Sequence, residues 1–252
     1  MNNSYCVCTM PNAYPSYRSH WDNFKDTGYD LQWISDVTRD PNFDVGFTYT
    51  EDDVRKNLNF KKEGVSRKHY WNAQGNRTIL WFYAHFRMMN YYISNPNYDY
   101  YWFFDDDVRA DNWVEFFKGF ENVDDDFISY FIFKHPSVET QPNVPKINSK
   151  THSGEGWFNR FPGDGDELPN NCNEIFGSFF PVVRYSKRAM EELVKINNQG
   201  YSGYSEGFVP TVLNSLGYKI SSLINSDDTS NYYDVDKVNL LHKNIRTTWS
   251  WI

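Results

Sequence analysis

The chain has 252 residues, with 33 acidic against 25 basic side chains and a formal net charge of −8. This balance argues against nucleic acid or an anionic membrane as a partner, because phosphate recognition normally requires a concentrated basic face. The aromatic content of 19% excludes a disordered chain, and the length suits one α/β domain with a substantial core.

The cysteines and the N-terminal residues indicate a reducing environment. The chain has an odd number of cysteines, namely Cys6, Cys8 and Cys172. Their positions lack the paired spacing of a metal site or a disulfide framework. Residues 1–9 lack the basic and apolar stretches of a signal peptide, and no run reaches the about 18 apolar residues of a membrane span. We therefore expect no transmembrane segment and a cytoplasmic location.

The first half of the sequence predicts alternating strands and helices. Strands are expected at residues 5–9, 30–34 and 45–49, followed by a helix at 51–58. An aromatic, apolar stretch at 77–92 is long enough for a helix packed on a sheet. The run at 98–104 is apolar on both faces, which is typical of a central strand covered by helices on both sides.

The second half continues this alternation. Helices are expected at 112–120, at 186–196 with Ser186 as N-cap, and at 207–216 with Pro210 near its start, and strands at 127–133, 179–183 and 218–224. Residues 136–173 are polar, rich in Gly and Pro and without periodicity, as functional loops often are. The alternation predicts an α/β sandwich with a mostly parallel central sheet.

Three aspartates, Asp105, Asp106 and Asp107, stand at the carboxyl end of the aromatic strand. In open α/β sheets, ligands bind beyond the carboxyl ends of the strands. Asp105 and Asp107 would point to the same side of an extended segment and would repel each other unless a cation lay between them. Mg²⁺ or Mn²⁺ fits such oxygen ligands and would neutralise a diphosphate leaving group. A solvated turn or a helix cap is the alternative.

The segment 100–109 (Tyr-Tyr-Trp-Phe-Phe-Asp-Asp-Asp-Val-Arg), with Asn112-Trp113 after it, resembles the metal-binding segment of glycosyltransferases with the nucleotide-sugar (GT-A) fold. It is more specifically similar to a little-characterised family of bacterial and fungal GT-A-like proteins, and the blocks 180–186 and 203–211 agree. The resemblance implies a single GT-A-like (Rossmann-like) α/β/α sandwich. It also implies transfer of a sugar from a nucleotide diphosphate to an acceptor hydroxyl, in glycan or surface polysaccharide synthesis.

The resemblance further implies roles for individual residues. Asp105 and Asp107 would hold Mn²⁺ or Mg²⁺, with His242 as a further metal or pyrophosphate contact unless it is an ordinary surface histidine. A UDP-sugar is the expected donor. Its candidate binding residues are Cys8, Thr9, Asp106 and Arg109, and those of the acceptor are Trp157, Phe158 and Tyr204. From the residues alone, Arg109 could instead pair with nearby acids, and Trp157 and Phe158 could instead anchor the long loop.

Glu206 is the candidate general base, which would take the proton of the acceptor hydroxyl as it attacks the anomeric carbon. It stands just before a predicted short helix, where it could equally be a carboxylate that favours the helix dipole. In the catalytic role the transfer would invert the anomeric configuration, although the sequence leaves inversion and retention open.

Two other functions are compatible with these residues: a non-catalytic glycan-binding protein of the same fold, and metal-dependent nucleotidyl or phosphoryl transfer by the same carboxylates. The lack of a Gly-rich phosphate loop excludes a dehydrogenase or an NTPase. We expect one domain over 1–252, with the nucleotide-binding part at about 1–110 and the acceptor side at about 111–252. The triplet 124–126 precedes a strand and is predicted to be a solvated turn.

Overall fold

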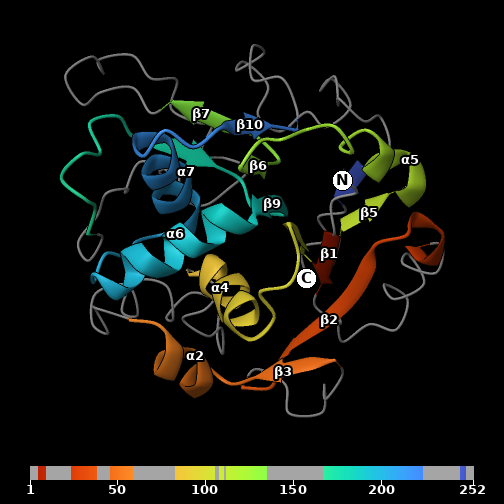
Figure 1. Ribbon diagram of the computed structural model, residues 1–252, viewed down its shortest axis with the longest axis horizontal. Helices are drawn as coiled ribbons and strands as arrows, with labels where there is room; N and C mark the ends of the chain where they lie inside the picture. The colour runs from red at the N-terminus through yellow and green to blue at the C-terminus, as the bar shows by residue number, and fades with distance from the viewer. Residues whose placement is uncertain are drawn as a thin grey trace, which may run out of the picture.

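A seven-stranded sheet forms the centre of the computed structural model, which describes residues 5–9, 24–38, 46–59, 83–105, 108–110, 112–134, 167–223 and 245–247. Its strands, in spatial order, are β10 (Ile220–Ser222), β6 (Phe127–Ser129), β9 (Val182–Ser186), β4 (Tyr100–Phe104), β1 (Tyr5–Thr9), β2 (Asp30–Asp36) and β3 (Phe47–Tyr49) (Figure 1). All of them run parallel except β9, which is antiparallel to both of its neighbours.

Helices cover both faces of this sheet. The buried hydrophobic residues form two clusters. Helices α4 (Ala84–Ser94), α6 (Lys187–Asn198) and α7 (Ser205–Ser215) contribute to one cluster, and α5 (Trp113–Lys118) contributes to the other. A further helix, α2 (Glu51–Asn57), follows β3. The predicted Rossmann-like α/β/α sandwich with a mostly parallel central sheet is therefore confirmed. The seven-stranded sheet takes strands from before and after residue 110.

Strand β4 divides its side chains between the two cores. Tyr101 and Phe103 pack with the cluster that contains α4 and α6, whereas Trp102 and Phe104 pack with the rings of α5. All five residues of the strand are buried. Full burial of one large apolar side chain contributes roughly 1.5–3 kcal/mol, so this strand is a major source of stability.

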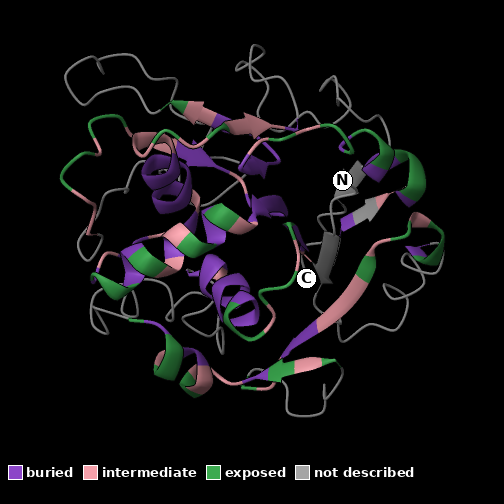
Figure 2. Cartoon of the chain, in the orientation of Figure 1, coloured by how far each residue is buried: buried purple, intermediate pink, exposed green. Residues whose placement is uncertain are grey.

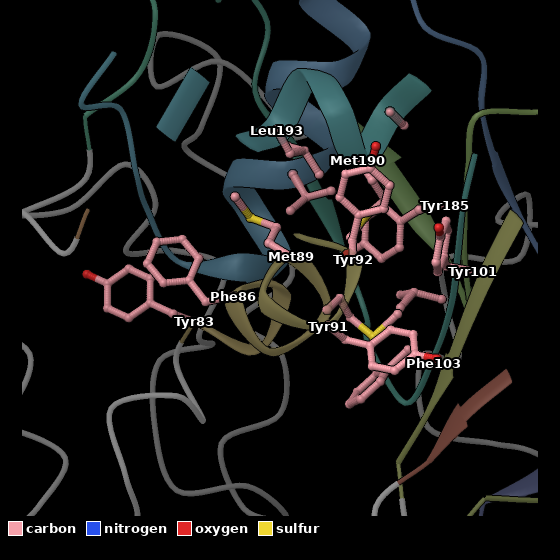
Figure 3. Close-up of a cluster of buried hydrophobic side chains, with 14 of the residues drawn as sticks. Tyr83, Phe86, Met89, Tyr91, Tyr92, Tyr101, Phe103, Tyr185, Met190 and Leu193 are labelled. Carbon is pink, nitrogen blue, oxygen red and sulfur yellow. The ribbon is translucent and has the colours of Figure 1, made fainter. Parts of the chain in front are cut away.

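The larger core lies between the sheet and helix α4. Figure 3 shows aromatic and sulfur-containing side chains of α4 and its N-cap meeting those of the sheet and α6, namely Tyr83, Phe86, Met89, Tyr91, Tyr92, Tyr101, Phe103, Tyr185, Met190 and Leu193. Helices α4 and α7 are buried along most of their length, as Figure 2 shows, whereas α6 alternates between buried and exposed residues. Among the described residues, no helix is both long and apolar enough to span a membrane.

Three helix ends follow the local sequence. Ser186 caps α6 by accepting the N–H of Ala189 at 3.2 Å, and Asn112 caps α5 by accepting the N–H of Glu115 at 3.2 Å. Gly217 follows α7 with a φ of +79°, a conformation that glycine adopts without strain. The N-cap predicted at Ser186 is confirmed. Helix α7 begins two residues earlier than expected, and the predicted helix residues 77–82 lie outside the described residues.

One predicted strand is divided in the structure, and another begins later than expected. Residues 127–133 form β6 and then β7 (Ile132–Lys134). The strand expected at 179–183 is β9, which begins at Val182, and three residues separate it from β8 (Phe176–Ser178), a strand that was not predicted. Strands β7 and β8 pair antiparallel as a separate two-stranded sheet. Pro181, which has no N–H to donate to a ladder, lies in the break between β8 and β9. Gly177 permits the close pairing, because a Cβ there would meet the Phe133 ring at 2.3 Å.

The predicted solvated turn at 124–126 is wrong for its last residue. Asp126 is 1% exposed and accepts hydrogen bonds from the Arg188 guanidinium at 2.5 Å, the Ser186 hydroxyl at 2.8 Å and the Lys219 N–H at 3.0 Å. Burial alone would raise the pKa of this carboxyl, but these hydrogen bonds together outweigh it and lower the pKa. Asp126 thus ties β6, α6 and the start of β10 together at the amino edge of the sheet.

Replacing Asp126 by Ala should lower the free energy of unfolding by about 2–4 kcal/mol, because buried donors on Ser186 and Lys219 lose a charged acceptor. Asp124→Ala is the matched control, since that exposed carboxylate pairs with the exposed Lys219 ammonium, at 2.7 Å. Its melting temperature should stay close to that of the wild type. Equal losses in the two variants, measured by denaturant unfolding, would contradict the structural role of Asp126.

Candidate functional site

The order of the strands identifies one edge of the sheet as the place for a ligand. From β1 the chain proceeds outward through β2 and β3 and then returns to pair β4 on the other side of β1. In doubly wound sheets, ligands bind at such a switch point, beyond the carboxyl ends of the strands. Thr9, the last residue of β1, pairs with Phe104, the last residue of β4. The candidate donor residues Cys8 and Thr9 therefore lie on the strand beside the aspartate triplet.

Asp105 occupies this edge directly after β4. It is partly buried, and its N–H donates to the carbonyl of Pro181 at 2.8 Å. Its own carbonyl accepts the N–H of Val108 at 3.1 Å, where β5 (Val108–Ala110) begins. These backbone bonds hold Asp105 at the carboxyl edge independently of its side chain. Asp106 and Asp107 lie outside the described residues.

A C-terminal strand lies beside β5. Strand β11 (Ile245–Thr247) pairs antiparallel with β5, so that Ile245 stands opposite Ala110. His242 lies outside the described residues, three positions before Ile245. Arg109 is the middle residue of β5, opposite Arg246. Within the described residues, no group of three or more His, Cys, Asp and Glu side chains is gathered around a point that could hold a metal ion.

Glu206 lies in the first turn of α7, and both of its carboxylate oxygens are bonded. Oε1 accepts the N–H of Phe180 at 3.3 Å, and Oε2 accepts the hydroxyl of Tyr204. Burial raises the pKa of Glu206 to about 7, against the lowering effect of these two hydrogen bonds. A carboxyl group with a pKa near neutrality is suited to take and return a proton at physiological pH.

One short loop joins Glu206 to Asp105. Phe180 donates its N–H to the Glu206 carboxylate, and the next residue, Pro181, accepts the N–H of Asp105. The general-base candidate and the first residue of the aspartate triplet therefore lie at the same edge of the sheet. Tyr204, predicted to bind the acceptor, has its hydroxyl on Glu206. Trp157 and Phe158 lie outside the described residues.

A buried histidine next to this edge was not among the predicted site residues. His85 of α4 is 1% exposed, and its Nδ1 is 2.9 Å from the hydroxyl oxygen of Ser205, the neighbour of Glu206. Its Nε2 is buried and has no hydrogen-bond partner in the part of the chain that the structure describes, and its ring stacks on Phe208. Burial lowers the pKa of His85 to about 3. In the sequence, His85 is one polar residue in an aromatic helix, and no spacing links it to Ser205.

The comparisons with known proteins give distant structural neighbours only. No protein-family model and no curated protein matches the chain. Among solved structures, it is similar to the galactosyltransferase LgtC in complex with donor and acceptor sugar analogs, with 11% identity and a TM-score of 0.36 over 88% of this chain and 73% of that chain. An active-site mutant of LgtC aligns with 12% identity and a TM-score of 0.38 over the same shares.

Mouse xyloside xylosyltransferase 1, in its apo form, aligns with 10% identity and a TM-score of 0.34 over 86% of this chain and 82% of that chain. At such identities and TM-scores, these likenesses assign neither a family nor an activity to the chain.

The Tyr204→Phe variant should raise the pKa of Glu206 above its value of about 7, because it removes a hydrogen bond that stabilises the ionised form. A ¹³C NMR titration of the Glu206 carboxyl carbon, assigned by its loss in Glu206→Gln, measures this. Tyr92→Phe is the control, since its hydroxyl binds Glu191 on α6 at 3.1 Å instead. A pKa that stays constant or falls in Tyr204→Phe would contradict the contact.

Burial of neutral His85 should make stability sensitive to acid. Its pKa is about 3 in the folded protein against an ordinary 6.5, so the unfolded chain binds the extra proton first as the pH falls. This contribution is complete above pH 6.5 and is lost toward pH 3, at up to about 1.4 kcal/mol per pH unit. The difference in unfolding free energy between wild type and His85→Asn should therefore shrink on acidification. If this difference in unfolding free energy does not change between neutral and acidic pH, the prediction for His85 is wrong.

Proposed function

We propose that the chain is a glycosyltransferase that moves a sugar from a nucleotide diphosphate donor to an acceptor hydroxyl. One observation carries the proposal: a carboxyl group with a pKa near 7, that of Glu206, lies at the carboxyl edge of the sheet where the aspartate triplet begins. This edge is also where the switch point between β1 and β4 favours a nucleotide. The proposed donor site and a group that can accept a proton therefore lie at the same edge of the sheet.

The residues that follow β4 suit a divalent cation. Consecutive carboxylates supply the hard oxygen donors that Mg²⁺ and Mn²⁺ prefer, and Asp105 is held at this edge by two backbone bonds. Asp105 and Asp107 are the proposed ligands, with His242 as a further contact. When bound, the cation would supply charge neutralisation to the diphosphate of a UDP-sugar.

Glu206 is the proposed general base. Its carboxylate takes the proton from the acceptor hydroxyl while the hydroxyl oxygen forms a bond to the anomeric carbon. The bond from that carbon to the donor phosphate oxygen breaks, its electrons remain on the phosphate oxygen, and the nucleoside diphosphate departs. The hydrogen bonds from Phe180 and Tyr204 keep the carboxylate oriented. A single displacement of this kind inverts the anomeric configuration.

Donor binding and catalysis should respond to different substitutions. Mn²⁺ with the correct nucleoside diphosphate should raise the melting temperature, because a ligand that binds only the folded state stabilises it. Asp105→Asn/Asp107→Asn should abolish this shift. Glu206→Gln should keep the shift but lower kcat by roughly 10²- to 10⁴-fold. In the wild type, kcat should increase as the pH rises toward about 7 and level off above it, because the base must be ionised.

Glu191→Gln is the matched control, because Glu191 also accepts a tyrosine hydroxyl but lies exposed on α6. Its kcat should equal that of the wild type. A panel of nucleoside diphosphates that leaves the melting temperature unchanged, with and without Mn²⁺, would overturn the proposal. Sugar binding without a metal requirement would then favour the non-catalytic glycan-binding alternative.

A further inference from the structure

Helix α7 contains a proline at a position where it leaves one carbonyl without its helical partner. Pro210 is the sixth residue of the helix Ser205–Ser215. An α-helix bonds each N–H to the carbonyl four residues earlier, and proline has no N–H. The carbonyl deprived in this way is that of Glu206, the proposed general base.

A serine on the neighbouring strand supplies the missing donor. The hydroxyl of Ser178, the last residue of β8, donates to the carbonyl of Glu206 at 2.9 Å. Ser178 is fully buried, with 0% of its surface exposed, so water does not compete for this contact. Two residues later, Phe180 donates its N–H to the carboxylate of the same glutamate. The end of β8 and the loop after it therefore hold both the backbone and the side chain of Glu206.

Further polar contacts fix the helix around this point. One turn further along α7, the buried Thr211 hydroxyl accepts the N–H of Phe176 at 2.9 Å and donates to its carbonyl at 3.2 Å. On the other side of Glu206, Ser205 contacts His85 of α4. Helix α7 is thus bonded to β8 at both ends of that strand and to α4 at its own first residue.

We propose that Ser178 is a positioning residue, which replaces the helical donor that Pro210 lacks and thereby fixes the Glu206 carboxylate against the end of β8. With an ordinary residue at 210, the carbonyl of Glu206 would be satisfied within α7 and would need no bond to the strand. The pair Ser178 and Pro210 instead transfers that bond to β8, the strand that leads to Phe180 and Pro181. Because small displacements of a catalytic group cost much rate, a bond at this place affects the reaction directly.

Ser178 could position the Glu206 carboxylate, or it could simply supply a donor to the buried carbonyl of Glu206. Ser178→Ala, Pro210→Ala and the double variant distinguish these two roles. Ser178→Ala removes the bond to β8 and leaves the Glu206 carbonyl without a donor. Pro210→Ala introduces a backbone N–H that can reach the same carbonyl, so the double variant restores the satisfaction of that carbonyl but not the bond to the strand. The double variant is also the control for a loss of stability in Ser178→Ala, because its melting temperature should return toward that of the wild type.

The deciding measurement is the ¹³C NMR titration of the Glu206 carboxyl carbon. In Ser178→Ala and in the double variant, the carboxyl should leave Phe180 and meet water, so its pKa should fall by about one unit or more from about 7 toward 4.5. With substrate, kcat should fall roughly ten- to a hundredfold in both variants, while KM stays nearly constant. Ser215→Ala should alter neither quantity, since that hydroxyl lies in the last turn of α7, where it bonds the Val212 carbonyl and contacts the Cys172 sulfur instead of Glu206.

An unchanged pKa in Ser178→Ala would overturn the inference, and so would a double variant in which both the pKa and kcat return to the wild-type values. The inference rests on the proposed role of Glu206, but the titration requires no substrate. A lowered pKa in a protein that transfers no sugar would therefore support the positioning by Ser178 and refute the proposed reaction.

Discussion

The burial of β4 on both faces is the constraint on which the candidate site depends. Four of its five residues pack into two separate cores, so the strand cannot shift or rotate without exposing large aromatic rings on one side. The strand is paired on one edge with β1 and on the other with β9. Asp105, the first polar residue after it, therefore emerges at a fixed point of the carboxyl edge. The aromatic helix α5, which packs its rings on Trp102 and Phe104, extends this support on one face.

Two acidic side chains with opposite pKa shifts distinguish the two edges of the sheet. Asp126, at the amino edge, is buried beside Arg188, and its pKa is lowered. Glu206, at the carboxyl edge, accepts hydrogen bonds from the neutral donors Tyr204 and Phe180 among the described residues, and its pKa is raised to about 7. Burial raises the pKa of both groups, but only at Asp126 do the hydrogen bonds, that of Arg188 first among them, outweigh burial. The first arrangement keeps a permanent charge for stability, whereas the second keeps a proton exchangeable near neutral pH.

The sequence was sufficient to predict what depends on neighbours along the chain. The central strand, the N-cap at Ser186 and the end of the last helix at Gly217 all follow from local patterns. The break within 127–133 was missed, because an apolar run does not show where a strand passes from one sheet to another. Strand β8 was not predicted, and the strand expected at 179–183 begins only at Val182, although Pro181 was a signal that the ladder is interrupted there. Asp126 was misjudged because its partner Arg188 is 62 residues away.

In the candidate site, too, local features were predicted from the sequence and long-range contacts were not. The aspartate triplet and Glu206 were identified from the sequence, since a carboxylate after a strand or at the start of a helix is visible in the order of residues. Their approach through Phe180 and Pro181 was not, because it requires the pairing of β4 with β9. The contacts of Ser178 and His85 with α7 could not be predicted from the sequence either. Each contacts α7 across the fold, and a single serine or histidine has no spacing that marks its partner.

The position of Glu206 in the first turn of α7 places three effects in opposition. Burial favours the neutral carboxylic acid, whereas the positive end of the helix dipole and the two hydrogen bonds favour the carboxylate. A more exposed residue would remain ionised and would be a weak base, and a residue without these donors would remain protonated and could take no proton. The near balance keeps both forms accessible, and it depends on where α7 begins. The contacts of Ser178 and Ser205 with the first turn therefore act on the chemistry of Glu206 as well as on the packing of the helix.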